Sequence, residues 1–202
     1  MKFDLENIVT REGGLKAEYG LIYGNHHVVI IKAGAGGSYV GYEEKYLKIA
    51  WKLHEAHGCT VVCLSNFSNT SFEDVDVHVI REVISKIKGE PRLYYVGNSN
   101  GATQGLHFAV KYFDFQRMVL INMPLMLNFH KTIAVLARTN TQIQFYYGEK
   151  DPSFSYVPFL KHVGQKETCA AKVTIETVAR ADHNFVGMMD QFIDLGSCVI
   201  QR

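Results

Sequence analysis

The stretch from Arg92 to Leu106 constrains the fold more than any other part of the sequence. An apolar run of β-forming residues ends in Gly97-Asn98-Ser99-Asn100-Gly101, and helix-forming residues follow directly. This pattern predicts a strand, a sharp turn with Ser99 at its apex, and a helix. Gly97 and Gly101 lack the Cβ atoms that would collide where strand and helix pass closely, so we expect both to be structural.

The pentapeptide around Ser99 has the G-x-S-x-G pattern, in which a strained turn exposes a serine hydroxyl above a sheet edge. Because the helix begins just after the serine, the backbone N–H of Asn100 lacks an intrahelical acceptor and is a candidate donor to an oxyanion. An ordinary turn serine between glycines is the alternative interpretation. A nucleophilic role for Ser99 requires a base, an orienting acid and a second oxyanion donor elsewhere in the chain.

Strands and helices alternate along the rest of the chain. This order predicts an α/β fold with three layers, in which helices cover both faces of a mostly parallel sheet. Two half-exposed strands, 3–9 and 15–23, are expected to be joined through Gly13-Gly14. Further strands are expected at 28–31, 59–64, 93–96, 117–121, 141–147 and 172–178, and helices at 42–57, 75–87, 102–113, 156–163 and 185–193, with a short helix before 141.

Length and composition narrow the class of protein. With 202 residues, 47% of them hydrophobic and 20% charged, we expect a single domain over residues 1–202 with a sizeable core. The net charge of +1 and the scattered Lys and Arg residues give no reason to expect a nucleic-acid partner. The sequence has no apolar signal region and no window of transmembrane length, so we expect a cytoplasmic protein without a membrane span.

Cys59 and Cys63 share one side of an apolar strand, which indicates buried structural thiols.

Asp151 and His183 supply a candidate acid and base in the order that the G-x-S-x-G turn requires. Each follows the carboxyl end of an expected strand, where open α/β sheets place their ligands, so both are expected to reach Ser99. In this interpretation His183 takes the serine proton and Asp151 orients the imidazole. Glu149 is a rival to Asp151 as the acid. Alternatively, Asp151 is a turn residue before Pro152 and His183 is a surface histidine or a histidine at a helix start. Asp182 is expected to cap the closing helix.

The loop Ala33-Gly34-Ala35-Gly36-Gly37-Ser38 follows the buried strand 28–31. Its glycines let backbone amides approach a ligand, and the N–H of Ala35 is the candidate second oxyanion donor, opposite that of Asn100. A dinucleotide-binding turn is the rival interpretation. However, Tyr39 stands at the third glycine position, and the next strand does not end in the acidic residue that a ribose requires.

A second cluster of candidate ligands is His54-Glu55-Ala56-His57 followed by Cys59. These residue types ligate zinc, but a further ligand group is not evident. Histidines at the carboxyl end of a helix interact favourably with the helix dipole. The pattern therefore favours a helix end, and we expect neither a metal nor another cofactor.

With these motifs in hand, the chain resembles the α/β-hydrolase superfamily along nearly its whole length. The resemblance rests on the turn around Ser99, the loop of residues 33–38, Gly148-x-x-Asp151 and Asp182-His183-Asn184-Phe185. It implies a sheet of about eight strands, a Ser99-Asp151-His183 triad and a small-molecule ester or thioester substrate, without a cofactor. A catalytically silent binding protein of the same fold, or an amide or peptide hydrolase using the same triad, are the alternatives.

Two departures from the family pattern affect these expectations. Many relatives begin the oxyanion loop with His-Gly, whereas this chain has Ala33-Gly34, so a support for the loop is missing or replaced. The connection between residues 121 and 141 is too short for a large cap domain. We therefore expect an open site walled by the loop residues Tyr39, Phe67, Phe154, Tyr156 and Phe185.

Overall fold

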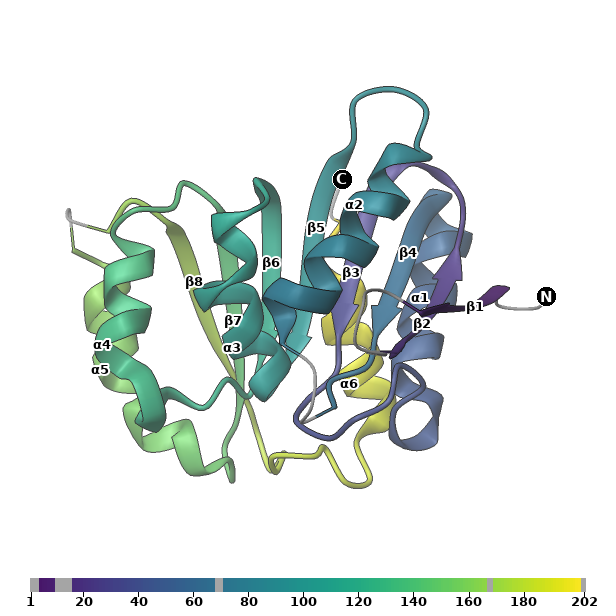
Figure 1. The fold of residues 1–202 in the computed structure, drawn as a ribbon. Coiled ribbons are helices and arrows are strands. Elements are labelled where there is room, and N and C mark those ends of the chain that lie inside the picture. Colours follow the sequence, from purple (N-terminus) through teal and green to yellow (C-terminus); the bar gives the residue numbers. More distant parts are fainter. Residues whose placement is uncertain (1–3, 10–15, 68–70, 167–168, 201–202) are drawn as a thin grey trace.

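The computed structural model describes residues 4–9, 16–67, 71–166 and 169–200, and its centre is an eight-stranded sheet (Figure 1). The strand order is β1-β2-β4-β3-β5-β6-β7-β8. Neighbours are parallel from β4 to β8 across the sheet, whereas β1 pairs antiparallel with β2 and β2 pairs antiparallel with β4. The strands are β1 (Asp4–Val9), β2 (Lys16–Ile22), β3 (Asn25–Lys32), β4 (Cys59–Leu64), β5 (Arg92–Asn98), β6 (Phe115–Ile121), β7 (Gln142–Gly148) and β8 (Lys172–Val178).

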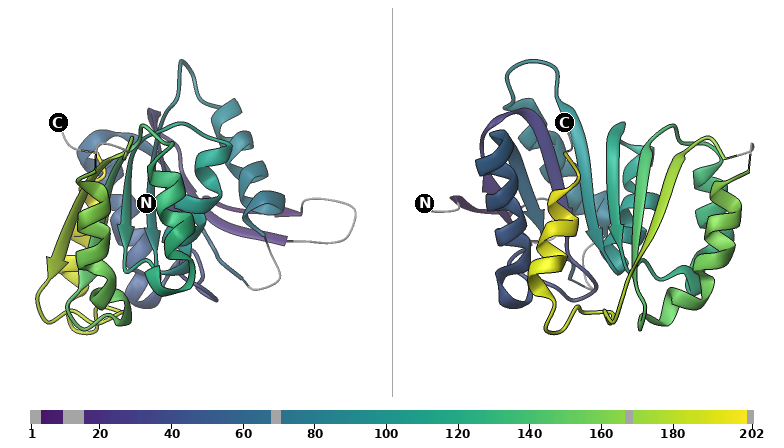
Figure 2. Two further views of the ribbon diagram at one scale, coloured as in Figure 1. Left: turned by 90° about the vertical axis from the view of Figure 1, so that its left-hand side faces the viewer. Right: turned by 180° about the vertical axis from the view of Figure 1, so that it is seen from behind.

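Helices cover both faces of this sheet, which confirms the three layers predicted from the sequence (Figures 1 and 2). One face carries α1 (Lys45–His57) and α6 (Met189–Ser197). The other face carries α2 (Val77–Ser85), α3 (Asn100–His107), α4 (Leu125–Leu136) and α5 (Val157–Gly164). Short helical turns lie at Tyr42–Glu44, Phe72–Asp76, Ala109–Lys111 and Pro152–Tyr156.

The central strands are buried on both sides because they are built from apolar residues with almost no polar interruption. Successive side chains of a strand point to opposite faces. Val28 and Ile30 of β3 accordingly pack in the core under α2 to α5, and Val29 and Ile31 pack in the core under α1 and α6. An unbroken apolar run is what a parallel strand covered on both faces requires.

Cys59 and Cys63 of β4 are both fully buried in the core under α1 and α6, which confirms the prediction of structural thiols. Burial raises the pKa of the Cys59 thiol to about 12, and it also raises the pKa of Cys63. Since the thiolate is the reactive form, neither side chain is a nucleophile near neutral pH.

The closing helix begins later than the sequence pattern indicated. It was expected over 185–193, but α6 spans Met189–Ser197. Phe185 has φ 56°, a left-handed backbone conformation that cannot begin a right-handed helix. The expected cap is therefore also wrong: Asp182 accepts hydrogen bonds from the N–H groups of Asn184 and Val186 in the preceding turn, and the N-cap of α6 is Met188.

The connection from β6 to β7 is short, as predicted. Residues 122–141 are all described, and they form α4 with brief flanking turns, so the structure has no large cap at this position. The expected junction through Gly13-Gly14 lies outside the described residues. Among the described residues, no helix has the length and apolar character needed to cross a membrane.

Candidate active site

Ser99 occupies a strained turn between β5 and α3, with φ 52° and ψ −122°. Its N–H donates to the carbonyl oxygen of Ile121 on the neighbouring strand at 2.8 Å, which fixes the turn against the sheet. A Cβ atom at Gly97 would lie 2.6 Å from Cα of Ala102, and one at Gly101 would lie 2.4 Å from the carbonyl oxygen of Ala33. Glycine is therefore required at Gly97, where β5 passes α3, and at Gly101, where α3 passes the end of β3.

His183 lies between Ser99 and Asp151. Its Nε2 atom is 2.9 Å from Oγ of Ser99, and its Nδ1 atom is 2.5 Å from Oδ2 of Asp151. The three residues come from the loops after β5, β7 and β8, whose carboxyl ends meet at the lower edge of the sheet in Figure 1. The side chain of Asp151 is fully buried, whereas that of His183 is 36% exposed. One ring nitrogen therefore faces a shielded carboxylate and the other faces the serine hydroxyl.

Asp151 also occupies the Asp-Pro turn that was its alternative interpretation. Its Oδ1 atom accepts a hydrogen bond from the N–H of Ser153 at 2.7 Å, which caps the helical turn Pro152–Tyr156. Its two carboxylate oxygens thus have different partners, because Oδ2 faces His183. The rival acid Glu149 accepts instead from the N–H of Arg180 at 3.0 Å, on the surface. Asp151 is therefore the carboxylate in contact with His183.

Asn122, which the sequence analysis did not single out, ties the loops of Asp151 and His183 together. Its side-chain amide donates to the carbonyl oxygens of Asp182 and His183, at 3.1 and 3.0 Å. Its Oδ1 atom accepts from the N–H of Gly148 at 2.8 Å. Asn122 is fully buried and has φ 49°, a left-handed conformation that asparagine tolerates better than most residues.

The loop of residues 33–38 lies against Ser99. A Cβ atom at Gly34 would be 3.3 Å from Cβ of Ser99. The amides of this loop have different partners: Gly34 donates to the Tyr46 hydroxyl, and Gly36 donates to the carbonyl oxygen of Asn66. Within the described part of the chain, the N–H of Ala35 has no such acceptor, and the residue is exposed. Its amide is therefore available to a ligand beside Ser99.

The N–H of Asn100 is the other candidate donor. Asn100 is the first residue of α3, so this N–H has no acceptor within the helix. It directly follows Ser99, which puts it next to the serine hydroxyl along the chain. The two candidate donors thus belong to two separate elements, the loop after β3 and the start of α3.

The predicted aromatic wall is wrong at one position. Phe185 is fully buried and packs edge to face against Phe192 of α6, with ring centroids 5.4 Å apart. The neighbouring Val186 is 66% exposed instead. The other expected wall residues, Tyr39, Phe67, Phe154 and Tyr156, are half-buried, and their place in a wall around the site stays a prediction.

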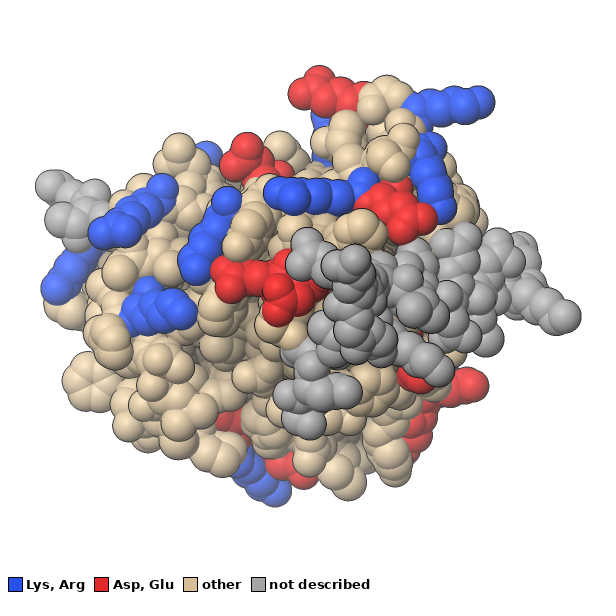
Figure 3. Space-filling model, viewed as in Figure 1, with Lys and Arg blue, Asp and Glu red and all other residues tan. Residues whose placement is uncertain are grey.

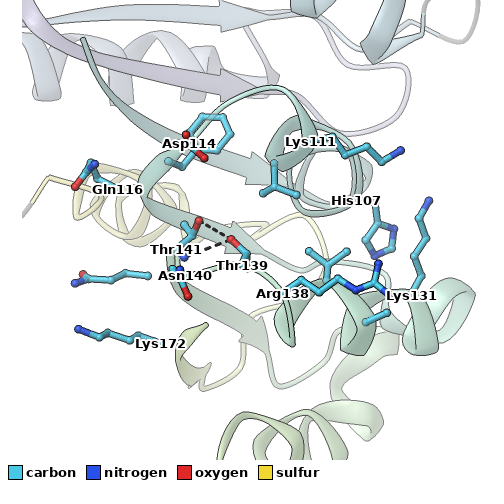
Figure 4. Close-up of a pocket in the computed structure, with 15 residues that line it drawn as sticks. His107, Lys111, Asp114, Gln116, Lys131, Arg138, Thr139, Asn140, Thr141 and Lys172 are labelled. Carbon is cyan, nitrogen blue, oxygen red and sulfur yellow. Dashed lines mark hydrogen bonds between the residues drawn. The ribbon is translucent and has the colours of Figure 1, made fainter. Parts of the chain in front are cut away.

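A cavity of about 760 Å³ lies at the opposite edge of the sheet, where β6, β7 and β8 begin (Figure 4). Lys111, Lys131 and Arg138 border one side of it and Lys172 the other. Basic side chains are also frequent on the face seen in Figure 3, with acidic ones between them. Ser99 is not among the residues that line this cavity. This cavity is therefore not evidence for a substrate pocket beside Ser99.

The second cluster of candidate ligands has a structural role. Nδ1 of His54 lies 2.8 Å from the carbonyl oxygen of Cys59, and both His54 and His57 are in the last turn of α1. This agrees with the helix-end interpretation. In the residues that the structure describes, no three His, Cys, Asp or Glu side chains are grouped as metal ligands would be.

Solved structures with the same fold match nearly the whole chain. Est1E from Butyrivibrio proteoclasticus is 11% identical, with a TM-score of 0.72, over 95% of this chain and 96% of its own. A dienelactone hydrolase from Anabaena variabilis is 15% identical, with a TM-score of 0.68, over 98% of this chain and 97% of its own. An α/β serine hydrolase homologue from Coxiella burnetii is 14% identical, with a TM-score of 0.71, over 100% and 99%.

These likenesses establish that the chain has the α/β-hydrolase fold, as the sequence predicted. At such low identities they concern the fold and not the reaction. No protein-family model matches the sequence, and no curated protein matches it.

Proposed function

We propose that this protein is a serine hydrolase that cleaves a carboxylic ester or thioester through an acyl-Ser99 intermediate. The observation that supports this most directly is the series of contacts from Ser99 Oγ to His183 Nε2 and from His183 Nδ1 to Asp151 Oδ2. A serine hydroxyl is a poor nucleophile near neutral pH, and a base oriented by an acid is what activates it. The names of the fold neighbours, esterases among them, agree with this reaction class.

In the proposed mechanism, Oγ of Ser99 attacks the carbonyl carbon while Nε2 of His183 takes the hydroxyl proton. The buried carboxylate of Asp151 holds the Nδ1–H tautomer and stabilises the imidazolium that forms. His183 then gives the proton to the leaving alcohol or thiol, and the C–O or C–S bond breaks. Water attacks the acyl group in the second half of the reaction, with His183 again acting as the base, and Ser99 is regenerated.

The negative charge that develops on the carbonyl oxygen needs donors that are already in place. The N–H groups of Ala35 and Asn100 are our candidates, because Asn100 follows Ser99, Ala35 follows Gly34, which lies against Ser99, and neither N–H is used by its own element. Preorganised donors of this kind contribute about 10²–10³-fold each to kcat. None of these steps uses a cofactor.

An open site favours a substrate whose scissile bond is accessible. The connection from β6 to β7, described in full, forms no large cap, and the side chain of His183 is partly exposed. Alcohols and thiols leave a tetrahedral intermediate more readily than amines do, so we place ester and thioester substrates ahead of amides and peptides.

The proposal is tested with wild type, Ser99→Ala and a matched control, Ser85→Ala. Ser85 is an exposed serine on α2 whose hydroxyl donates to the carbonyl oxygen of Glu82. Hydrolysis is measured on p-nitrophenyl acetate and butyrate, a thioester and an anilide. We expect turnover by wild type and Ser85→Ala and a loss of at least about 10³-fold for Ser99→Ala. Equal rates for wild type and Ser99→Ala would refute the role of Ser99.

A further inference from the structure

We propose that Asn66 is the positioning residue of the oxyanion hole. Its side chain fixes the loop that carries Ala35 relative to the start of α3, which carries Asn100. This inference rests on the proposed function. It addresses the departure at Ala33-Gly34, where a support of the loop is missing or replaced. Asn66 lies two residues beyond the end of β4 and is 4% exposed.

The side chain of Asn66 contacts both elements that carry the candidate donors. Its Nδ2 atom donates to the carbonyl oxygen of Ala33 at 2.9 Å and to Oδ1 of Asn100 at 3.1 Å. Its Oδ1 atom accepts from Nε2 of Gln104, one turn further along α3, at 3.2 Å. One amide therefore bridges the loop and the helix.

The backbone of Asn66 holds the other end of the loop. Its N–H donates to the carbonyl oxygen of Gly37, and its own carbonyl oxygen accepts from the N–H of Gly36, both at 2.8 Å. Ala35 is therefore enclosed between two attachments, one at Ala33 through the side chain and one at Gly36-Gly37 through the backbone. Its own N–H is not used by either attachment, so the segment is fixed while its donor stays available.

Ser65, the residue that precedes Asn66, is held in place as well. The buried ammonium of Lys32, at the end of β3, donates to the carbonyl oxygen of Ser65 and pairs with Asp76 of the helical turn Phe72–Asp76. The chain on the β4 side of Asn66 is thus anchored to β3. Movement of Asn66 independently of the sheet is restricted by this contact.

The chemistry of the position favours an amide. Asn66 acts as a donor to two oxygens and as an acceptor from one nitrogen, and only Asn and Gln among the side chains offer an NH₂ group and a carbonyl oxygen together. An aspartate of nearly the same shape would place a carboxylate oxygen against the Ala33 carbonyl and Oδ1 of Asn100. Repulsion between these oxygens would push the loop away from α3.

Catalysis should be sensitive to this displacement because oxyanion donors act only at hydrogen-bond distance from the developing charge. A misplacement of about 1 Å can cost about 10²-fold in rate. Substrate binding in the ground state depends less on these donors, so their displacement should lower kcat more than it changes KM. In Asn66→Ala the pH profile should keep its shape, since the hydrogen bonds that the Asn66 side chain makes are to Ala33, Asn100 and Gln104 and involve no titrating group.

The test compares wild type, Asn66→Asp and Asn66→Ala with Asn140→Asp, a matched control. Asn140 is exposed and lies at the opposite edge of the sheet. For Asn66→Asp we expect kcat to fall about 10–100-fold, with KM changed less than about threefold. Asn66→Ala loses the hydrogen bonds without gaining a charge, so its kcat should fall less than that of Asn66→Asp. Asn140→Asp should behave as wild type.

A second readout does not depend on turnover. Amide hydrogen exchange by NMR should be faster at Gly36 in Asn66→Asp and Asn66→Ala, and the Ala35 and Asn100 signals should shift. Wild-type kcat in both Asn66 variants, or unchanged exchange and signals, would overturn the inference. If wild type itself fails to turn over any ester, the proposed function fails, and the exchange result alone decides whether Asn66 positions these amides.

Discussion

The side-chain amide of Asn122 donates to the backbone carbonyl oxygen of His183 at 3.0 Å, from a buried position directly after β6. The same side chain accepts from the N–H of Gly148, three residues before Asp151. Asn122 therefore fixes the loop of the candidate base His183 relative to the loop of the candidate acid Asp151, and it does so through backbone atoms. Asn122 follows β6 and Asn66 follows β4, and these strands lie on opposite sides of β5, which leads to Ser99.

Replacing Asn122 by Ala should affect both stability and turnover. The Gly148 N–H would lose its partner inside the protein, and alanine fits a left-handed backbone less well, which together should lower the free energy of unfolding by about 2–3 kcal/mol. The loosened His183 loop should reduce kcat by about 10–100-fold. Urea unfolding and ester hydrolysis measure the two effects.

Asn122→Asp separates the two roles, because it keeps an acceptor for Gly148 but loses both donors to the His183 loop. We expect it to be more stable than Asn122→Ala and still impaired in kcat. A kcat within twofold of wild type in both variants would show that Asn122 has no positioning role.

Gly97→Ala should destabilise the fold strongly. The added Cβ would lie 2.6–2.7 Å from the backbone of Ala102, which cannot move aside as a side-chain end could. Overpacking of this kind costs about 1–3 kcal/mol and sometimes more. The control is Gly164→Ala at the end of α5, where the new Cβ would meet the Val173 side chain at 3.3 Å. Equal midpoints of urea unfolding for the two variants would contradict the close strand–helix contact.

The Lys32–Asp76 pair is buried, with its charged atoms 2.5 Å apart. Burial lowers the pKa of the Lys32 ammonium and raises the pKa of the Asp76 carboxyl, while each charge opposes the shift of the other. Removing one partner leaves an uncompensated charge, so Lys32→Met should cost about 3–5 kcal/mol. The double variant Lys32→Met/Asp76→Leu should be more stable than Lys32→Met alone, as measured by chemical unfolding. An additive loss would rule out a coupled pair.

His107 should make the protein less stable in mild acid. Burial, with the nearby Lys131, His130 and Lys111, lowers its pKa from 6.5 to about 4. Between these values the unfolded chain binds more protons than the folded chain, so the free energy of unfolding falls as the pH drops through this window. From about pH 7.5 to about pH 5 the loss from this residue is about 2 kcal/mol.

His107→Gln retains a polar partner for the Thr132 hydroxyl, which lies 3.0 Å from Nε2 of His107 in the wild type. Its free energy of unfolding should therefore depend less on pH over the same interval. An identical pH dependence in the variant and the wild type would exclude His107 as the source.

The sequence predicted the parts of the site that follow from strand order. Ser99, Asp151 and His183 each lie in the segment that follows a strand, and the carboxyl ends of parallel strands share one edge, so their proximity could be expected. The strands at 59–64 and 172–178 match β4 and β8 because their runs are rich in apolar and β-branched residues.

Other features depend on tertiary contacts that leave little trace in a single sequence. Asn122 and Asn66 were missed because an asparagine after a strand is typical of any loop. The signal that could have found them is their place, one residue after β6 for Asn122 and two residues after β4 for Asn66, at the same edge as Ser99. The left-handed conformation of Phe185 could not be predicted, because a helical apolar pattern contains no information that such a residue interrupts it.

The most direct test of the central claim is intact-mass spectrometry after treatment with a fluorophosphonate, which reacts covalently with activated serines. The relay from Asp151 through His183 to Ser99 predicts a single adduct on the wild-type protein and none on Ser99→Ala. Folding of both proteins is checked by circular dichroism. A folded wild type that forms no adduct, or an adduct that persists on Ser99→Ala, would contradict the assignment of Ser99 as the nucleophile.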